Sequence, residues 1–481
     1  MTTTRKVLLI LALVYGIPLA AITVLAYLWL RDEPPPYDED LKVQRIQIPE
    51  DQNAFTYLLR ATGKFQRPRG DAPLAWDANK PGAEYEPRTE AELFHQIVRG
   101  TRWDGQFVDS VLKKNAEALA LWQQVLAAPQ FQLPQVRSIE DRIPYIFDCL
   151  DLANLVSLRA KTAARQAEYE AAYQDQMKLV RFGQRMAGAK GCLVEYLVAS
   201  TIKAMGASEM ADMTGECTLS SARLRAYAAE LAKYPADPQG LADAYRGEYA
   251  MYCGAVDDFW EGRYCGGPSR FLAPTESPGM DPDSLPVWKV WIGPLLKRNR
   301  TKGMFAQACR RMVENAPKAF REVPPRDASI GESGFARDIL SGNPIGCWLY
   351  RALAPATEGA HEQMCRERIQ LGATRVLLAM KAYKLDKGAL PRTLDELVPQ
   401  YLNAVPIDDY DGKPMRYNAA KKVVYSVGRD LKDGGGMTME DYLKARRKEF
   451  DESGMSWDEK AQAEQAKDNW HWPDPSFEIK F

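Results

Sequence analysis

Hydrophobic residues recur every three or four positions through most of this chain, the spacing of one apolar helix face. Alternation between apolar and polar residues, the sign of a strand, is nearly absent before residue 400. Residues 49–365 are therefore expected to form an all-α body of antiparallel helical hairpins without a fixed repeat length. The pattern predicts helices over residues 53–62, 107–126, 143–158, 168–186, 192–213, 219–233 and 287–315.

Two short motifs in this body indicate helix starts. Thr89-Glu90-Ala91-Glu92 and Ser138-Ile139-Glu140-Asp141 each place a hydroxyl three residues before a carboxylate. The two side chains of such a capping box bind each other's backbone N–H groups and so open a helix. We expect one helix to begin at each motif.

Residues 366–436 have a different pattern and form a separate predicted unit. A helix with one apolar face should end at Gly388, and Thr393-Leu394-Asp395-Glu396 should open a short second helix. Strand-like runs follow at 415–417 and 423–427, and a loop rich in Asp and Gly over 428–436 closes the unit. The apolar face of the first helix comprises Ile369, Ala373, Val376, Leu377, Met380 and Tyr383.

A charged tail over residues 437–481 completes the predicted domain order. Capping boxes begin at Thr438 and Ser456, and they predict two charged amphipathic helices. The apolar residues near the end of the chain, around Phe477, are expected to return to the small sheet.

The unit at 366–436 resembles the C-terminal part of the G-type major pseudopilin of type II secretion systems. The resemblance lies in the order Gly388, Leu390-Pro391, Leu394-Asp395-Glu396-Leu397, Tyr401-Leu402, Pro406, Asp408, Asp411-Gly412-Lys413-Pro414, Tyr417, Tyr425-Ser426-Val427-Gly428, Asp430 and Asp433-Gly434-Gly435. It implies a long helix followed by a small antiparallel sheet, with a final loop that can hold calcium. The same signature is similar to the end of large membrane-anchored proteins of planctomycete-like bacteria.

The resemblance does not extend to the amino terminus. The pseudopilin family places a Gly, a cleavage site, a Phe and a Glu around the start of its N-terminal helix. Here Thr4-Arg5-Lys6-Val7 leads into an uncharged run instead. Processing and polymerisation as a pilin are therefore not expected.

The uncharged run spans 24 residues, Val7 to Leu30. About 20 apolar residues suffice to cross a bilayer, so residues 7–30 are predicted to be a transmembrane helix. Arg5 and Lys6 favour a cytoplasmic stub at 1–6, which places the rest of the chain outside the inner membrane. The alternative, a cleavable signal peptide, normally has a shorter apolar region and a small-residue cleavage site. A Pro-rich linker over 31–48 is expected to hold the body off the membrane.

Composition narrows the classes of partner. The 63 basic and 64 acidic residues give a formal net charge of −1, which argues against a nucleic-acid-binding surface. The lipid bilayer and envelope or secretion proteins are the partners that the predicted topology favours. Eight cysteines, with no Cys-x-x-Cys pair, leave open a Cys253–Cys265 disulfide or buried free thiols.

Motifs for catalysis are scarce. Neither a phosphate-binding loop nor a Gly-x-Ser-x-Gly nucleophile elbow occurs. His361 and Cys365, four residues apart, supply only two potential metal ligands. Asp257, Asp258 and Glu261 can be read as an acid–base group or as an exposed helix end. We therefore predict no catalytic residue.

The loop after the second strand offers a calcium site. Asp430 and Asp433, with Ser426, present hard oxygen ligands in a glycine-rich turn, which calcium prefers. The pseudopilin resemblance supports this assignment. A hydrogen-bonded turn without metal is the alternative, because Asp and Gly form turns by themselves.

Three functions remain open at this point. The first is a membrane-anchored structural or protein-interaction role in the cell envelope. The second is a pilus-type or type II secretion assembly role. The third is an envelope enzyme with a groove near residues 245–290, where aromatic residues precede a Pro-rich loop; these aromatics can equally complete the helical core.

Overall fold

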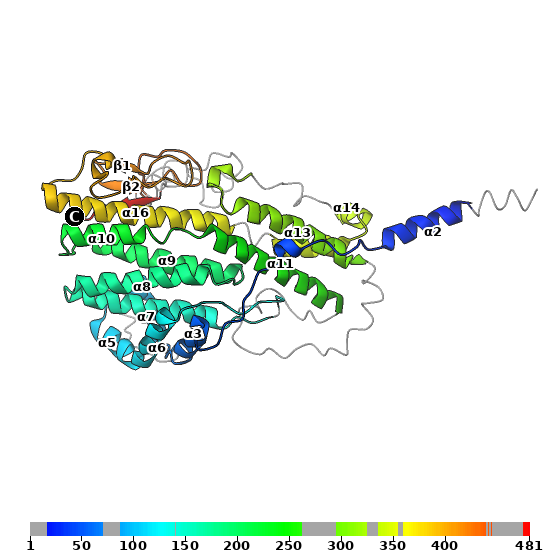
Figure 1. Cartoon of the computed structure of the whole chain (residues 1–481), viewed down its shortest axis with the longest axis horizontal. Coiled ribbons are helices and arrows are strands. Elements are labelled where there is room, and N and C mark those ends of the chain that lie inside the picture. The colour runs from blue at the N-terminus through cyan, green and yellow to red at the C-terminus, as the bar shows by residue number, and fades with distance from the viewer. Residues whose placement is uncertain are drawn as a thin grey trace, which may run out of the picture.

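Helices make up most of this protein, and one small antiparallel sheet lies near the carboxyl end (Figure 1). The structure is a computed structural model that describes residues 17–70, 87–139, 141–261, 295–324, 335–354, 359–438, 441, 444 and 475–481. The α-helices that follow α2 (Ile17–Leu30) are α3 (Ala54–Gly63), α4 (Glu90–Val98), α5 (Gly105–Lys114), α6 (Ala116–Ala127), α7 (Tyr145–Arg165), α8 (Tyr169–Ala187), α9 (Leu193–Met213), α10 (Ser221–Leu231), α11 (Pro238–Glu261), α13 (Arg298–Asn315), α14 (Phe335–Leu340), α15 (Pro344–Leu353) and α16 (Gly359–Lys387).

The predicted mainly α body with helical hairpins is confirmed. Helices α7, α8 and α9 are joined by short connections and lie side by side (Figure 1). Helix α13 packs against α11, and α6 packs against α3. The buried apolar residues of these helices form one large core cluster.

The predicted single helix over 107–126 is wrong, because Asn115 divides it into α5 and α6. The Asn115 side chain is buried and binds the backbone of Gln66 in both directions, at 2.7 Å and 3.1 Å. Asparagine leaves helical geometry readily when its side chain can bind backbone groups. The break therefore ties α5 and α6 to the end of the α3 segment.

Of the two capping boxes in the body, only the first opens a helix. Thr89 Oγ1 accepts the Glu92 N–H at 3.2 Å at the start of α4. At the second motif the Asp141 carboxylate accepts the N–H groups of Arg137 and Ser138, which closes a turn. The helix starts only at Tyr145, since Pro144 disfavours helical backbone at the residue before it.

Helix α16 is the centre of the C-terminal part. It ends at Lys387, and Gly388 follows with a positive φ of 78°, as the glycine stop predicts. The predicted apolar face is buried except for Tyr383, which is partly buried, and Leu371, Leu378 and Ala382 on other sides are buried too. Helices α9 and α10 cover one side, and β2 and the 3₁₀ helix η10 (Leu394–Leu397) cover another. The predicted domain boundary at 365/366 lies inside this helix.

The sheet has the order β1-β2-β3, all antiparallel. Strands β1 (Arg416–Asn418) and β2 (Val423–Tyr425) form the predicted hairpin. Strand β3 (Ser476–Glu478) comes from the end of the chain and pairs Phe477 with Val424, so the expected return of the terminus is confirmed. The predicted α-helix at Thr393 is a 3₁₀ turn, η10, without a side-chain cap bond. The predicted tail helices lie almost entirely outside the described residues.

The linker over 31–48 is docked on the body and does not hold the body away from α2. The Asp32 carboxylate accepts the N–H of Asn299 at 2.9 Å at the start of α13. Asp40 binds Arg310 through both carboxylate oxygens, at 2.7 Å and 2.9 Å. Farther along, Arg45 donates to the carbonyl of Lys190 at 2.8 Å. These contacts along its length hold the linker against α13, α11 and the start of α9.

Helix α2 extends from the body at the amino end of the chain (Figure 1). It is 14 residues long in the described part, and residues 7–16 of the predicted span lie outside the described residues. Within the described ranges, no helix combines the length and the hydropathy needed to cross a bilayer. The exposed side chains of α2 include Leu19 and Ile22, at 65% and 62% exposure.

Candidate functional site

Arg416 on β1 donates hydrogen bonds to three carboxylates of the C-terminal unit. Its Nε donates to Asp433 Oδ2 at 3.0 Å and its Nη1 to Asp408 Oδ2 at 3.2 Å, while Nη2 binds Asp411. Successive side chains of a strand point to opposite faces, so Arg416 points away from Met415 and Tyr417. We call Arg416, Asp408, Asp411 and Asp433 the arginine cluster.

Asp408 is the fully buried member of the arginine cluster. Burial raises the pKa of its carboxyl, while hydrogen bonds from Val427 N and Ser426 Oγ, at 2.9 Å and 2.8 Å, act in the opposite direction. The more exposed Asp433 has a lowered pKa, because bonds from Gly435, Tyr425 and Arg416 outweigh its partial burial. The cluster therefore joins three segments through charged hydrogen bonds: the turn with Asp408 and Asp411, strand β1, and the glycine loop with Asp433.

The predicted calcium ligands lie in and beside the arginine cluster. Ser426 Oγ donates to Asp408, and Asp433 Oδ1 accepts from Tyr425 Oη at 3.1 Å and Gly435 N at 3.0 Å. Asp430 accepts the Lys432 N–H at 3.1 Å. In the part of the chain that is described, no three His, Cys, Asp or Glu side chains are placed to hold a metal ion together. In this arrangement Arg416 supplies the positive charge beside Asp433. Calcium at Ser426, Asp430 and Asp433 stays a prediction, and it requires Asp433 to leave Arg416 and bind the ion.

Calcium is expected to leave the thermal stability of the protein unchanged, because Asp433 already accepts hydrogen bonds from Arg416, Tyr425 and Gly435. An ion present at one hundred times its dissociation constant would add about 2.7 kcal/mol to the free energy of unfolding. Thermal unfolding in excess calcium and in chelator measures the difference. A midpoint several degrees higher in calcium would support the ion site and contradict the arginine-based loop.

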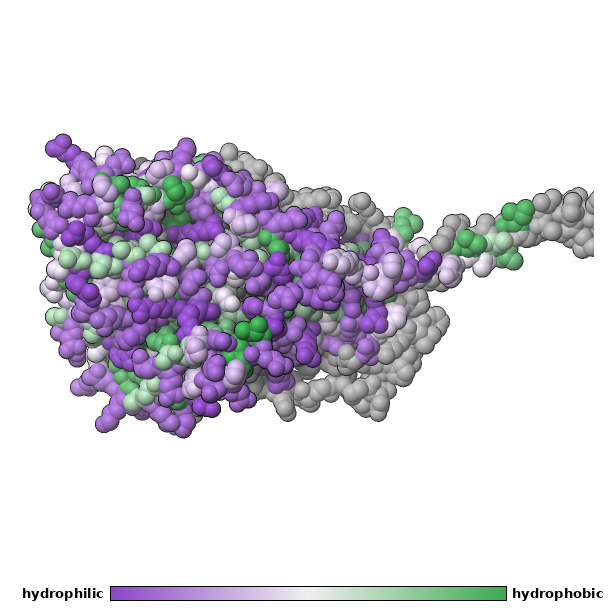
Figure 2. Space-filling view, in the orientation of Figure 1, coloured by the Kyte–Doolittle hydropathy of each residue, from purple (hydrophilic) through white to green (hydrophobic). Residues whose placement is uncertain are grey.

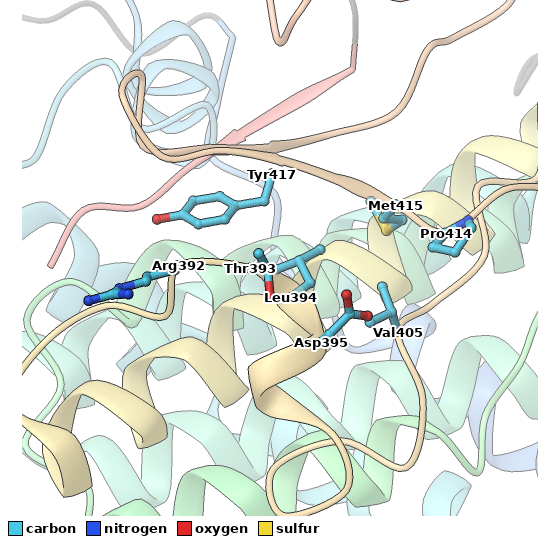
Figure 3. A pocket seen from close by; sticks show the side chains of 8 residues that line it. All are labelled: Arg392, Thr393, Leu394, Asp395, Val405, Pro414, Met415 and Tyr417. Atoms are coloured by element: carbon cyan, nitrogen blue, oxygen red, sulfur yellow. The ribbon is translucent and has the colours of Figure 1, made fainter.

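A pocket lies on the other side of β1, with a volume of about 270 Å³. Figure 3 shows Tyr417 on β1, and Met415 just before it, on the side of the strand that faces the segment with Arg392, Thr393 and Leu394. Its floor contains the buried side chains of Leu394 and Met415, whereas Thr393 is exposed. The full lining is Arg392, Thr393, Leu394, Asp395, Val405, Pro414, Met415 and Tyr417. Its size suits one side chain of a partner rather than a cofactor, since small-molecule sites start near 300 Å³.

Two of the acidic residues at the end of α11, Asp257 and Asp258, join this helix to neighbouring segments. Asp257 binds Arg298 and Lys302 of α13, with the Lys302 contact at 2.8 Å. Asp258 accepts a hydrogen bond from the Ser138 hydroxyl. These contacts join α11 to its neighbours. Asp257 is paired with two cations, and such pairing disfavours the proton uptake that a general base performs.

The His361 and Cys365 pair lies on α16 as predicted, with Cys365 Sγ 3.8 Å from His361 Nδ1. The other ring nitrogen of His361 lies 3.0 Å from the carbonyl oxygen of Lys318. Burial raises the pKa of the Cys365 thiol, which keeps the thiol protonated and disfavours its use as a nucleophile. Burial lowers the pKa of His361, so its ring is neutral and its Nε2–H donates to the Lys318 carbonyl.

The aromatic residues near the predicted groove belong mostly to the core. Tyr245, Tyr249 and Tyr252 of α11 are buried, and the rings of Tyr252 and Phe305 lie 4.6 Å apart. Residues 262–290 of the predicted groove lie outside the described residues, as does Cys265. The described cysteines, Cys253 included, are free thiols.

Two buried carboxylates at the start of α9 were missed by the sequence reasoning. Glu195 binds the Cys192 N–H at 2.6 Å, and Glu248 of α11 binds the Leu193 N–H at 3.0 Å. The Tyr145 hydroxyl also donates to Glu195. The pair satisfies N–H groups that the first turn of a helix leaves free, which is a structural role. Glutamates at the third helical position of α9 and inside α11 were the only sequence signal.

Glu248→Gln is expected to become more stable relative to the wild type as the pH rises from 5 to 8. Burial raises the pKa of Glu248 to about 7, above its ordinary value of 4.5. A raised pKa gives stability that is complete below the unfolded value and lost as pH rises through the folded value, at up to about 1.4 kcal/mol per unit. Urea unfolding of both proteins at several pH values measures this difference. Parallel pH profiles would contradict a buried titrating Glu248.

Comparison with known proteins gives no relative: the chain matches no protein-family model, no curated protein and no solved structure.

Proposed function

We propose that this protein is a single-pass membrane protein of the bacterial cell envelope, with an extracytoplasmic helical body and a pseudopilin-type C-terminal unit that binds other envelope proteins. Residues 7–30 anchor it in the inner membrane, with the amino terminus in the cytoplasm. Its role is structural or that of an interaction module. The catalytic alternative is weaker, because Asp257 is held in ion pairs with two cations and the Cys365 thiol is buried.

The observation that carries this proposal is helix α2. Its large apolar side chains are exposed to a degree that a helix of a globular core does not tolerate, and it stands apart from a body whose visible face is mostly hydrophilic (Figure 2). An apolar helix that does not pack on a protein core is stable only in an apolar environment such as the bilayer interior. The uncharged sequence continues through residues 7–16, which brings the run to bilayer length.

The C-terminal unit supports the interaction role. A long helix followed by a small antiparallel sheet is the arrangement that the resemblance to the G-type pseudopilin implies. The pocket beside β1 joins an apolar floor to the exposed polar groups of Arg392 and Asp395. Such a surface fits one apolar side chain of a protein partner and lacks converging acid and base groups.

The anchor is tested by placing two charges in α2. Each lysine near the middle of a membrane helix opposes insertion by about 2.5–3.5 kcal/mol. Leu19→Lys/Ile22→Lys is therefore expected to move the full chain from the alkaline-resistant membrane fraction to the soluble fraction. The control is Leu59→Lys on α3, which is also an exposed leucine but lies on the body. Retention of the double variant in the membrane would overturn the proposal.

A pilus-type assembly role is the second candidate, favoured by the helix-and-sheet unit alone. In the described residues α16 is covered by α9, α10 and the sheet, so it offers no free face for stacking against another copy. Processing near residue 6 is a requirement of this role. An intact amino terminus, measured by mass spectrometry of the membrane-bound protein, would count against it.

A further inference from the structure

The end of the body beside α2 carries exposed large apolar side chains. Leu340 is 79% exposed at the last residue of α14, Ile339 beside it is 40% exposed, and Trp348 on α15 is 51% exposed. Helices α14 and α15 are consecutive and pack against each other. We call Ile339, Leu340 and Trp348 the apolar rim. Single exposed apolar residues are ordinary, but several on adjoining helices mark a contact surface.

Gly342 fixes the position of the apolar rim relative to α2. Its φ is +70°, and a Cβ atom built on it would lie 3.0 Å from the backbone oxygen of Trp29 and 3.2 Å from Trp29 Nε1. The last turn of α2 therefore approaches the turn between α14 and α15. Figure 1 shows α14 at the end of the body from which α2 extends.

The connection between α2 and the body is rigid as well as close. The Asp32 carboxylate accepts the N–H groups of Asn299 and Arg300 at the start of α13, at 2.9 Å and 3.3 Å. Arg300 Nη1 donates to the Ser341 carbonyl at 2.7 Å, which joins α13 to the same turn. The rim therefore keeps a fixed height relative to the end of α2.

The position of Trp29 indicates where the apolar rim lies relative to the bilayer surface. It precedes Leu30, the last residue of the uncharged run, where tryptophan favours the boundary between acyl chains and headgroups. Leu340 is two residues from Gly342, a distance of at most about 7 Å along the chain. The headgroup layer on each side of a bilayer is about 5–7 Å thick. Leu340 and Ile339 thus lie within reach of the layer that holds Trp29.

We propose that the apolar rim rests in the surface of the lipid bilayer and holds the helical body against the membrane in one orientation. This inference rests on the proposed function, because it requires α2 to cross the bilayer. Two cations beside the rim are already paired, since Arg351 binds Asp338 and Arg300 binds Ser341 and Glu33. The rim itself is apolar, so the part of the lipid that it contacts is the acyl chain.

Photocrosslinking of the full chain in bacterial membranes that contain alkyne-labelled fatty acids tests the contact. Benzoylphenylalanine is introduced separately at position 340 and at position 348. Leu59 on α3 and Leu385 on α16 are the matched control positions, because both are exposed leucines on the body. Ile22 on α2 reports on the anchor. Positions 340 and 348 are expected to give at least about ten-fold more lipid adduct than the controls.

The outcomes separate the two proposals. If position 22 gives lipid adducts and positions 340 and 348 do not exceed the controls, the rim does not touch lipid and only this inference fails. If positions 340 and 348 give protein adducts in place of lipid adducts, a protein covers the rim and the inference is again overturned. If position 22 gives no lipid adduct, the anchor and the rim fail together.

Discussion

Lys203→Met is expected to lower the free energy of unfolding by about 3–5 kcal/mol, the cost of leaving one charge of a buried pair without its partner. Lys203 of α9 and Glu367 of α16 are both at most 2% exposed, and their Nζ and Oε1 atoms lie 2.7 Å apart. Lys203 also donates to Gln184 and to the carbonyl oxygen of Pro235. The pair joins the helical body to the C-terminal unit, so both parts should lose stability together. Urea unfolding followed by circular dichroism measures the loss.

The matched control for this pair is the double variant Lys203→Met/Glu367→Met. Replacing both charges by apolar side chains of similar volume removes the unpaired carboxylate, so most of the lost stability should return. Recovery is expected to be incomplete, because the Pro235 carbonyl loses its donor. A double variant as unstable as Lys203→Met would show that packing at this site, and not the buried charge, determines the effect.

Arg416→Met should lower the free energy of unfolding by about 3 kcal/mol, because it removes the only described cation of the arginine cluster and leaves the buried Asp408 without it. The loss should be smaller at pH 4 than at pH 7. Burial raises the pKa of Asp408 above its ordinary value of 3.8, so part of this carboxyl is protonated at pH 4 and needs no cation, whereas the lowered pKa values of Asp411 and Asp433 cost the wild type stability only below that pH. In the variant, protonation instead relieves repulsion among the carboxylates.

Arg429→Met is the control for Arg416→Met, since Arg429 lies in the loop that carries Asp433 but its side chain is 64% exposed and its closest approach to Glu362 is 3.5 Å. An exposed pair of this kind contributes about 0.5 kcal/mol or less. Chemical unfolding of both variants at pH 4 and pH 7 gives the comparison. Equal losses for the two arginines would contradict the special role of the arginine cluster.

Helical spacing in the sequence was sufficient to predict the mainly α fold, because apolar residues recur at helical spacing through most of the body. The prediction was wrong where one side chain with tertiary partners decides the backbone, as Asn115 does between α5 and α6 and Pro144 does before α7. The burial of α16 on several sides could not be predicted from its own sequence. It arises because α9, α10, η10 and β2 cover it.

The predicted calcium site stays a prediction. Of its three residues, Ser426 binds Asp408, Asp433 binds Arg416, and Asp430 accepts the Lys432 N–H within the loop. Arg416 was missed, because local spacing does not show which of many basic residues will reach three separate carboxylates. One signal was present in the sequence: an arginine at the start of a short strand, flanked on both sides by acidic turns. The apolar rim was not predictable either, since its meaning depends on the approach of Trp29 to Gly342.

The measurement that tests the central claim most directly is the location of the carboxyl end of the full chain in a bacterial host. Two fusions are made after Phe481, one to alkaline phosphatase, which is active only outside the cytoplasm, and one to a fluorescent protein that matures only inside it. A membrane helix at residues 7–30 with a cytoplasmic amino terminus predicts an active phosphatase fusion and a dark fluorescent fusion. A fluorescent fusion together with an inactive phosphatase would contradict the account.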